Sequence, residues 1–246
     1  MNADPAAQQR LLDLQGIDTA LAQLAHRRRT LPELAGIEAA AATANELETE
    51  VFDAQTSVDD LAGEQRRLEN EVEAVRARSG RDEQRLQAGE LPAKELEGLQ
   101  HEITSLARRQ SSLEDELLEV MEQREGVDGG LAELNQRRDA VLAERADLER
   151  RRDEQFAEID ASAATRRAER EAVAAELPAD LLTLYDKVAA ASGGVGAAML
   201  KQRRCEGCHL ELAGSELTDV RNAAADSVLR CENCRRILVR TAESGL

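Results

Sequence analysis

Residues 96–120, LEGLQHEITSLARRQSSLEDELLEV, decide the fold of this 246-residue chain. Leucine, isoleucine and valine recur here at steps that alternate between three and four residues. This heptad pattern, with a mean period of about 3.5 residues, predicts a helix that pairs with another helix in a left-handed coiled coil. The pattern continues to Leu148, and a matching one runs from Leu47 to Leu86. Each stretch therefore needs a helical partner.

The composition agrees with long helices and excludes a conventional globular core. The chain has one Tyr, two Phe and no Trp, and 33% of its residues are charged. With so few aromatic side chains and so many charged ones, the chain cannot build a conventional globular core of its length, whereas such a composition with a helical period is typical of coiled coils. We therefore expect a mainly α fold.

A hairpin tip is predicted at Gly89-Glu90-Leu91-Pro92, between the two heptad stretches. Folding back there gives two arms, residues 6–88 and 93–176, that can pair antiparallel within one chain. The alternative is a homodimer of parallel coiled coils, because heptads alone do not identify the partner helix. The sequence leaves open whether the protein is a monomer or a homodimer.

Prolines and glycines predict interruptions in both arms. Pro32 should end or kink the first arm near Thr30, because proline lacks the N–H that a helix interior requires. Three glycines, Gly126, Gly129 and Gly130, should weaken the second arm.

All four cysteines lie in two Cys-x-x-Cys pairs near the C-terminus: Cys205, Cys208, Cys231 and Cys234. Two such pairs can supply the four thiolates of a tetrahedral zinc site, and four protein ligands leave no open position for a catalytic water. Twenty-two residues separate the pairs, slightly more than the usual pattern. We predict one structural zinc ion.

Other uses of these cysteines are weaker interpretations. Disulfides or a redox couple would suit an oxidising compartment or a βαβ frame, but the N-terminus lacks the features of a secretory signal and no βαβ pattern surrounds either pair. We therefore expect a cytoplasmic protein without a membrane span. His209, directly after Cys208, is an alternative ligand, although four cysteines already fill the site.

The chain is expected to divide into a hairpin over residues 1–176, a connecting helix and glycine hinge over 177–194, and a zinc ribbon over 195–246. Ser192-Gly193-Gly194 ends the connecting helix, predicted over 180–191. In the ribbon we expect strands over 195–201, 227–230 and 237–240 and a helix over 215–222 capped by Ser215. Such a ribbon would have almost no core of its own, so that a metal would be needed for it to fold.

The sequence resembles bacterial proteins that carry a coiled-coil hairpin followed by a four-cysteine zinc ribbon. The resemblance rests on five stretches: residues 14–18 (LQGID), 31–32 (LP), 94–103 (KELEGLQHEI), 205–212 (CEGCHLEL) and 230–238 (RCENCRRIL). It implies that the four cysteines ligate zinc. Some relatives act as chaperones or adaptors that bind an alternative sigma factor or parts of flagellar and type III export systems, and nucleic-acid binding has been proposed for the ribbon.

Charge gives a second hypothesis for function. Residues 201–240 carry eight basic and six acidic residues, whereas the whole chain has a net charge of −17. Four arginines flank the cysteine pairs and are candidate nucleic-acid contacts: Arg203, Arg204, Arg235 and Arg236. The same arginines could instead neutralise a zinc–thiolate centre or dock on the acidic coil. Aromatic residues that could stack on bases are absent from the ribbon sequence.

The sequence offers no support for an enzyme. The three histidines are scattered at 26, 101 and 209, and neither a nucleophile motif nor a phosphate-binding glycine loop is present. We therefore expect a protein-binding adaptor or scaffold, with nucleic-acid binding by the ribbon as the alternative.

Overall fold

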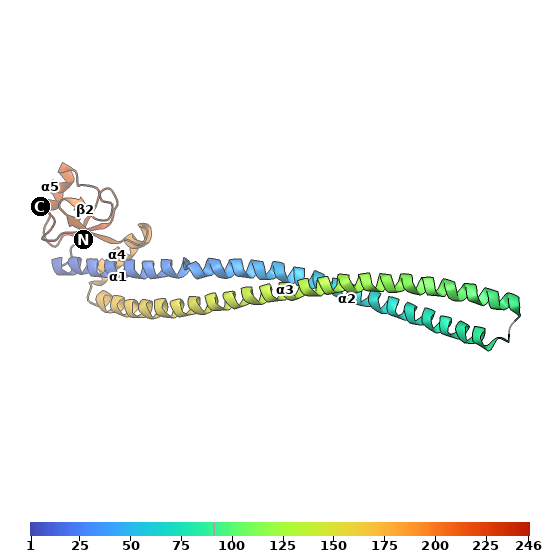
Figure 1. Cartoon of the computed structure of the whole chain (residues 1–246). Helices are drawn as coiled ribbons and strands as arrows, with labels where there is room; N and C mark the ends of the chain where they lie inside the picture. The colour runs from blue at the N-terminus through green and yellow to red at the C-terminus, as the bar shows by residue number, and fades with distance from the viewer. Residues whose placement is uncertain (91) are drawn as a thin grey trace. The chain divides into compact units, whose positions relative to one another are not determined.

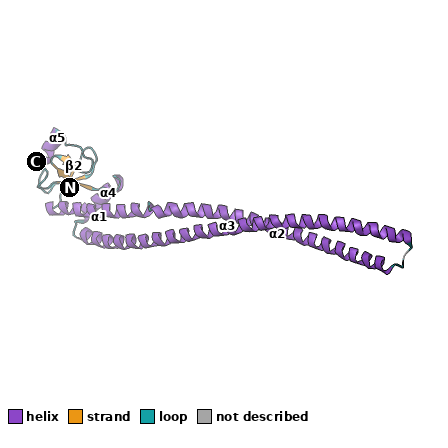
Figure 2. Cartoon of the chain, in the orientation of Figure 1, coloured by secondary structure: helices purple, strands orange, loops and turns teal. Residues whose placement is uncertain are grey.

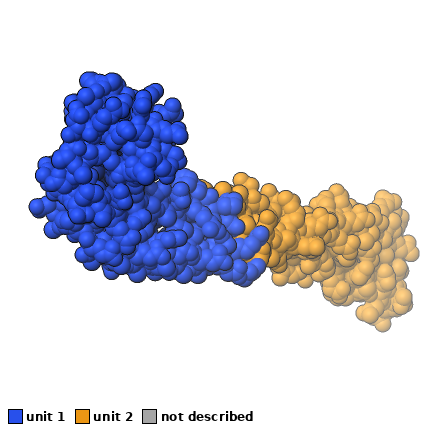
Figure 3. All heavy atoms as spheres, turned by 90° about the vertical axis from the view of Figure 1, so that its left-hand side faces the viewer, with its two compact units in different colours: residues 1–34, 149–246 blue, residues 35–148 orange. Residues whose placement is uncertain are grey.

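The computed structural model describes residues 1–90 and 92–246, so that Leu91 of the predicted tip lies outside the described residues. Its contacts gather the chain into two compact units, residues 1–34 with 149–246, and residues 35–148 (Figure 3). The boundaries expected at residues 176 and 194 stay predictions. No helix of the described part is long and apolar enough to cross a membrane.

The unit of residues 35–148 is an antiparallel pair of helices (Figures 1 and 2). It is built from α2 (Pro32–Ala88) and α3 (Ala93–Ala175), which confirms the predicted intrachain hairpin. Leu68, Val72 and Leu113 form the buried centre of its seam. The heptad leucines and valines therefore find their partner within the same chain.

Charged residues beside the seam connect the two helices. Arg78 pairs with Glu102, and Arg76 lies 2.5 Å from Glu114. These pairs are largely exposed, so each contributes little stability by itself, and most of the stability comes from the apolar seam.

The helix breaks follow the prolines but not the glycines. The first helix, α1 (Pro5–Arg29), ends just before Thr30, as Pro32 predicts. Helix α3, however, continues without interruption through Gly126, Gly129 and Gly130, so the expected break in the second arm is wrong. Tertiary pairing overrides the modest helix-weakening effect of single glycines.

The other unit contains α1, the end of α3, α4 (Ala179–Ala191) and the C-terminal ribbon. The ribbon has four strands, β1 (Ala197–Lys201), β2 (Arg204–Cys205), β3 (Leu229–Arg230) and β4 (Ile237–Val239), in the sheet order β2-β1-β4-β3. Strands β1 and β4 are parallel, and the two outer strands are antiparallel to their neighbours.

Two details of the ribbon differ from expectation. Helix α5 (Gly214–Asn222) has Ala213 at its N-cap and no side-chain cap, so the predicted Ser215 cap is wrong. Strand β2 lies outside the three predicted strands.

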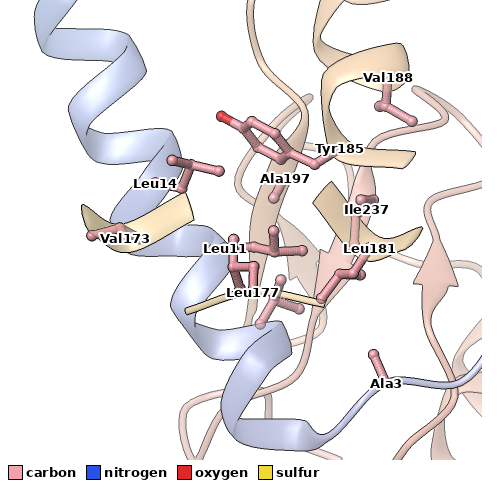
Figure 4. Close-up of a cluster of buried hydrophobic side chains, with 11 residues drawn as sticks. Ala3, Leu11, Leu14, Val173, Leu177, Leu181, Tyr185, Val188, Ala197 and Ile237 are labelled. Atoms are coloured by element: carbon pink, nitrogen blue, oxygen red, sulfur yellow. The ribbon is translucent and has the colours of Figure 1, made fainter. Parts of the chain in front are cut away.

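The ribbon has a buried apolar cluster of its own around the cysteines, so the prediction that it has almost no core is wrong, and it also shares a hydrophobic core with the helices. Leu11 and Leu14 of α1 meet Tyr185 of α4 and Ile237 of β4 in one buried cluster (Figure 4). The other buried members are Ala3, Val173, Leu177, Leu181, Val188, Ala197 and Val239. Segments from both ends of the chain thus hold the sheet in place.

We expect Leu113→Ala to lower the free energy of unfolding by about 2–5 kcal/mol, because it leaves a cavity in the seam. Leu113 is 1% exposed, whereas Leu118 on the same helix is 58% exposed, so Leu118→Ala is a matched control with an expected change within about 0.5 kcal/mol. Urea unfolding followed by circular dichroism measures both. Equal effects of the two changes would contradict the assigned seam.

Candidate metal centre

The four cysteines meet at one point of the ribbon. Their sulfur atoms all lie within 4.8 Å of one another, with Cys205 Sγ 3.8 Å from Cys234 Sγ and Cys208 Sγ 3.9 Å from Cys231 Sγ. Zinc–sulfur bonds of about 2.3 Å place the sulfur atoms of a tetrahedron about 3.8 Å apart. The separations therefore fit a four-thiolate zinc site.

The same distances rule out disulfides between these cysteines. A disulfide requires sulfur atoms about 2.05 Å apart, and all four thiols are free. His209 is exposed and lies outside the metal-competent group, which in the described part of the chain consists of the four cysteines.

Each Cys-x-x-Cys pair forms the same backbone turn. In the first knuckle, the N–H of His209 donates to the carbonyl of Cys205, and the N–H of Cys205 donates to the carbonyl of Leu210. In the second, the N–H of Arg235 donates to Cys231 and the N–H of Cys231 donates to Arg236. The two halves of the site are thus equivalent by hydrogen bonding, although 22 residues separate them.

Both knuckles end in left-handed backbone. His209 has φ 58° and Arg235 has φ 64°, in the region that usually favours glycine. The fold therefore imposes a strained conformation at the fourth position after each leading cysteine, at a cost of about 1–3 kcal/mol per residue.

The leading cysteines are the most buried members of the site. Cys205 and Cys231 are 0% exposed, and burial raises the pKa of both thiols. Burial also acts on Cys234, but the backbone N–H of Arg236 and neighbouring side chains lower the pKa of this thiol. Bound zinc would hold all four sulfurs as thiolates. Without a metal, burial favours the protonated thiols of Cys205 and Cys231.

A buried carboxylate supports the second knuckle. Glu216 of α5 is 4% exposed and accepts a hydrogen bond of 3.0 Å from the N–H of Glu232. Sequence reasoning missed Glu216, because one Glu among many gives no local signal.

A second apolar cluster surrounds the cysteines. It is formed by Ala198, Leu200, Leu212, Val220 and Leu238.

The four candidate arginines have different surroundings. Arg236 donates to the carbonyls of Ser192, Val195 and Gly207, at 3.0, 3.2 and 2.8 Å. It therefore links the α4–β1 connection to the first knuckle. Arg203 donates to the carbonyl of Gly245.

Arg204 and Arg235 have exposed side chains on the ribbon. Of the four candidate nucleic-acid contacts, Arg236 is thus the one whose guanidinium is occupied by three main-chain acceptors. This arrangement agrees with a structural role for that residue.

A buried polar network connects α1 to the start of the ribbon. The side-chain oxygen of Gln15 accepts hydrogen bonds from Tyr185 Oη at 3.1 Å and from the N–H groups of Gly196 and Ala197 at 2.6 and 3.3 Å. The single hydroxyl proton of Tyr185 is shared between Gln15 and Asp18, whose Oδ2 lies 2.8 Å from Tyr185 Oη, and Asp18 pairs with Arg170. The stretch over residues 14–18 is the sequence signal for this network.

The glycine at 196 is required by this packing. A Cβ there would lie 2.7 Å from Cδ2 of Tyr185. The adjoining turn is also fixed, because Gln15 Nε2 donates to the carbonyl of Gly194 at 3.1 Å.

A helical hairpin joined to a four-cysteine ribbon defines the class of protein. Residues 14–193 match the CT398-like coiled coil hairpin domain, and residues 204–238 match the C4-type zinc ribbon domain. The chain belongs to the family that carries this hairpin.

Two mycobacterial proteins with similar sequences are named as uncharacterized proteins. One from Mycobacterium tuberculosis is 38% identical over 240 residues, covering 98% of both chains. One from Mycobacterium leprae is 32% identical over 214 residues, covering 87% of this chain and 92% of the relative.

Solved structures share the fold. A Mycobacterium smegmatis protein matches with a TM-score of 0.87 at 34% identity, covering 98% of this chain and all of its own. CT398 from Chlamydia trachomatis matches with a TM-score of 0.70 at 19% identity, covering 96% and 98%. At that identity, the second likeness concerns the fold alone.

Metal removal is expected to unfold the ribbon while sparing the hairpin. With a chelator or in Cys231→Ser, hydrogen exchange should rise over residues 197–239 and stay unchanged over 35–148, because the seam contains no metal ligand. Hydrogen exchange in the ribbon that does not change when the chelator is added would contradict a structural metal.

Zinc affinity should also fall as pH falls, since burial raises the pKa of Cys205 and Cys231 and protons then compete for the thiolates.

Gly207→Ala should destabilise the first knuckle by about 1–3 kcal/mol through overpacking. The added Cβ would lie 2.7 Å from Cδ of Arg236 and 2.9 Å from Cβ of Ala198. Gly214→Ala is the control, because nothing lies within 4 Å of a Cβ at that position. Thermal unfolding and zinc titration would reveal the difference, and unchanged behaviour of Gly207→Ala would contradict this packing.

Proposed function

We propose that this protein is a non-enzymatic adaptor that binds a protein partner, with one structural zinc ion in its ribbon. The observation that carries the proposal is the closed four-cysteine cluster. Because four thiolates complete a tetrahedron, no coordination position is left for a water or a substrate. Zinc would then build a rigid interaction head and would not act as a Lewis acid.

The surroundings of the histidines also favour a binding protein over an enzyme. His26, His101 and His209 are all exposed and lie in three separate elements or turns of the chain. General acid–base catalysis usually places such groups in a cleft beside a second polar partner. The reduced thiols suit the cytoplasm, where we place the protein.

Exposed apolar side chains on the hairpin offer a surface for a partner. On residues 35–148, Phe52 is 71% exposed and Leu142 is 43% exposed, although the seam itself is filled by the chain's own helices. Light scattering coupled to size exclusion measures whether two copies associate through such surfaces.

Nucleic-acid binding by the ribbon is the second candidate function. The exposed side chains of Arg203, Arg204 and Arg235 favour it, since exposed arginines can contact phosphates. The three carbonyl partners of Arg236 count against it, as do those of Arg240, which donates to five carbonyls between Val220 and Ser227.

A pull-down of the tagged full chain from its native cells, with and without nuclease, tests the two functions. For an adaptor, we expect one discrete protein that is retained after nuclease treatment and retained by the triple variant Arg203→Ala, Arg204→Ala, Arg235→Ala. Material that disappears with nuclease or in that variant would favour nucleic-acid binding, and its affinity should then fall steeply with salt. Retention of neither class would overturn the adaptor proposal.

A further inference from the structure

A groove runs along α1 in the unit that contains the ribbon. It consists of two adjoining hollows of about 480 and 500 Å³, which share Thr19, Gln23 and Val195 in their walls. Neither hollow contains a cysteine of the metal centre, although Glu206 and Gly207, which lie between Cys205 and Cys208, line one of them.

One wall of the groove is a single face of α1. Its residues are spaced so that each has neighbours three or four positions away, and Thr30, the C-cap of α1, closes the row. The α1 members are Leu12, Gln15, Gly16, Thr19, Ala20, Ala22, Gln23, His26 and Arg27. At the helical rise of 1.5 Å per residue, the stretch from Leu12 to Thr30 spans about 27 Å. That length accommodates a partner helix of about five turns.

The opposite wall comes from the ribbon. Gly193, Gly194 and Val195 of the α4–β1 connection face one half of the groove, and β1 with the first knuckle faces the other. Glu206 and Gly207 are the knuckle residues in this wall. The groove therefore depends on the ribbon being folded, and Gln15, through its bonds to Gly194 and Gly196, fixes the separation of the walls.

The half of the groove beside β1 contains small and apolar side chains, whereas Thr19, Gln23 and Val195 lie where the two halves meet. Ala20 and Gly16 lie on α1, opposite Met199 of β1. Nothing lies within 4 Å of the position that a Cβ on Gly16 would take. Small residues of this kind allow a second backbone to approach closely, as in helix-in-groove recognition.

The ends of the groove differ in charge. His26 and Arg27 line one end, and they begin the longest run of basic residues in a chain with a net charge of −17, His26-Arg27-Arg28-Arg29. All four side chains are exposed, and within the chain Arg27 donates to Gln155 and Arg28 pairs with Asp160. Glu206 lies at the other end. An occupant with acidic residues at the His26–Arg27 end would match this polarity.

The lining favours protein over nucleic acid. No aromatic side chain lines either hollow, so bases would have no surface on which to stack. The half of the groove beside β1 would also place a phosphodiester backbone against alanine, valine and methionine, which is costly for charged groups.

We infer that this groove binds an amphipathic segment of a partner protein, with small apolar residues along one face and acidic residues at the end that meets His26 and Arg27. The inference rests on the proposed adaptor function and assigns it a binding surface.

Photo-crosslinking from inside the groove tests this inference. The full chain would carry p-benzoyl-phenylalanine at Ala22, which is exposed and lines the groove, or at Ala25, which is exposed on α1 but is absent from the lining. After irradiation in native cells and nuclease treatment, mass spectrometry identifies the cross-linked segment. We expect Ala22, but not Ala25, to capture a protein segment with the predicted apolar face and acidic end.

Two further variants test the groove without disturbing the core. Gly16→Leu fills the groove, and Arg27→Glu reverses the charge at its basic end. Each should reduce the cross-link yield from Ala22 by about tenfold or more. Gly63→Leu is the matched control, because Gly63 is exposed on α2 and also has nothing within 4 Å of an added Cβ. The cross-link yield from Ala22 in Gly63→Leu should equal the yield without that substitution.

Several outcomes would overturn the inference. These are equal capture from Ala22 and Ala25, no capture, capture of nucleic acid or of a second copy of this chain, and undiminished capture in Gly16→Leu. If the protein found by pull-down is still retained by Gly16→Leu at the original yield, the groove assignment fails but the adaptor function stands. If no protein is retained at all, the adaptor function itself fails.

Discussion

The convergence of four sulfur atoms from two distant turns is the constraint on which the ribbon depends. Each knuckle is a local structure, but the two meet only because β1 and β4 run side by side and parallel, with Ala197 opposite Ile237. The buried thiols of Cys205 and Cys231 gain no solvation from water, so an ion held between the knuckles is the natural compensation for their burial. The metal centre and the short sheet therefore stabilise each other.

The ribbon is also held from outside by a helix at the other end of the sequence. Gln15 lies in α1, yet its side chain satisfies main-chain donors where β1 begins. Leu11 and Leu14, on the neighbouring face of the same helix, are both 0% exposed. One face of α1 is thus used for packing, while the adjoining face is left open as the groove wall. The same helix serves stability and, in our proposal, recognition.

The hairpin and the cysteine cluster could be predicted from the sequence because both depend on local spacing. Heptad leucines such as Leu68 and Leu113 reveal their pairing through the period, and a Cys-x-x-Cys pair reveals its turn. The docking of the ribbon could not be predicted in this way. Gln15, Tyr185 and Gly196 share no local spacing in the sequence, and only the fold brings them together. Even the start of α5 was misjudged, since the chain enters that helix at Ala213 and not at the better capping residue Ser215. Family likeness marked residues 14–18 as special but gave no physical reason for them.

The bond between Asn2 and Asp226 joins residues 224 positions apart, and the carbonyl of Met1 accepts from Val228. This pairing has a consequence for biosynthesis. The ribosome releases α1 long before it has made the ribbon. Leu11 and Leu14 therefore lack their packing partners from the ribbon while the rest of the chain is synthesised. Residues 35–148 can pair during this interval, and once paired they shorten the effective loop that the two ends must close. The paired hairpin then brings the two ends of the chain together, so that residues 1–34 and 149–246 can form the unit that folds last.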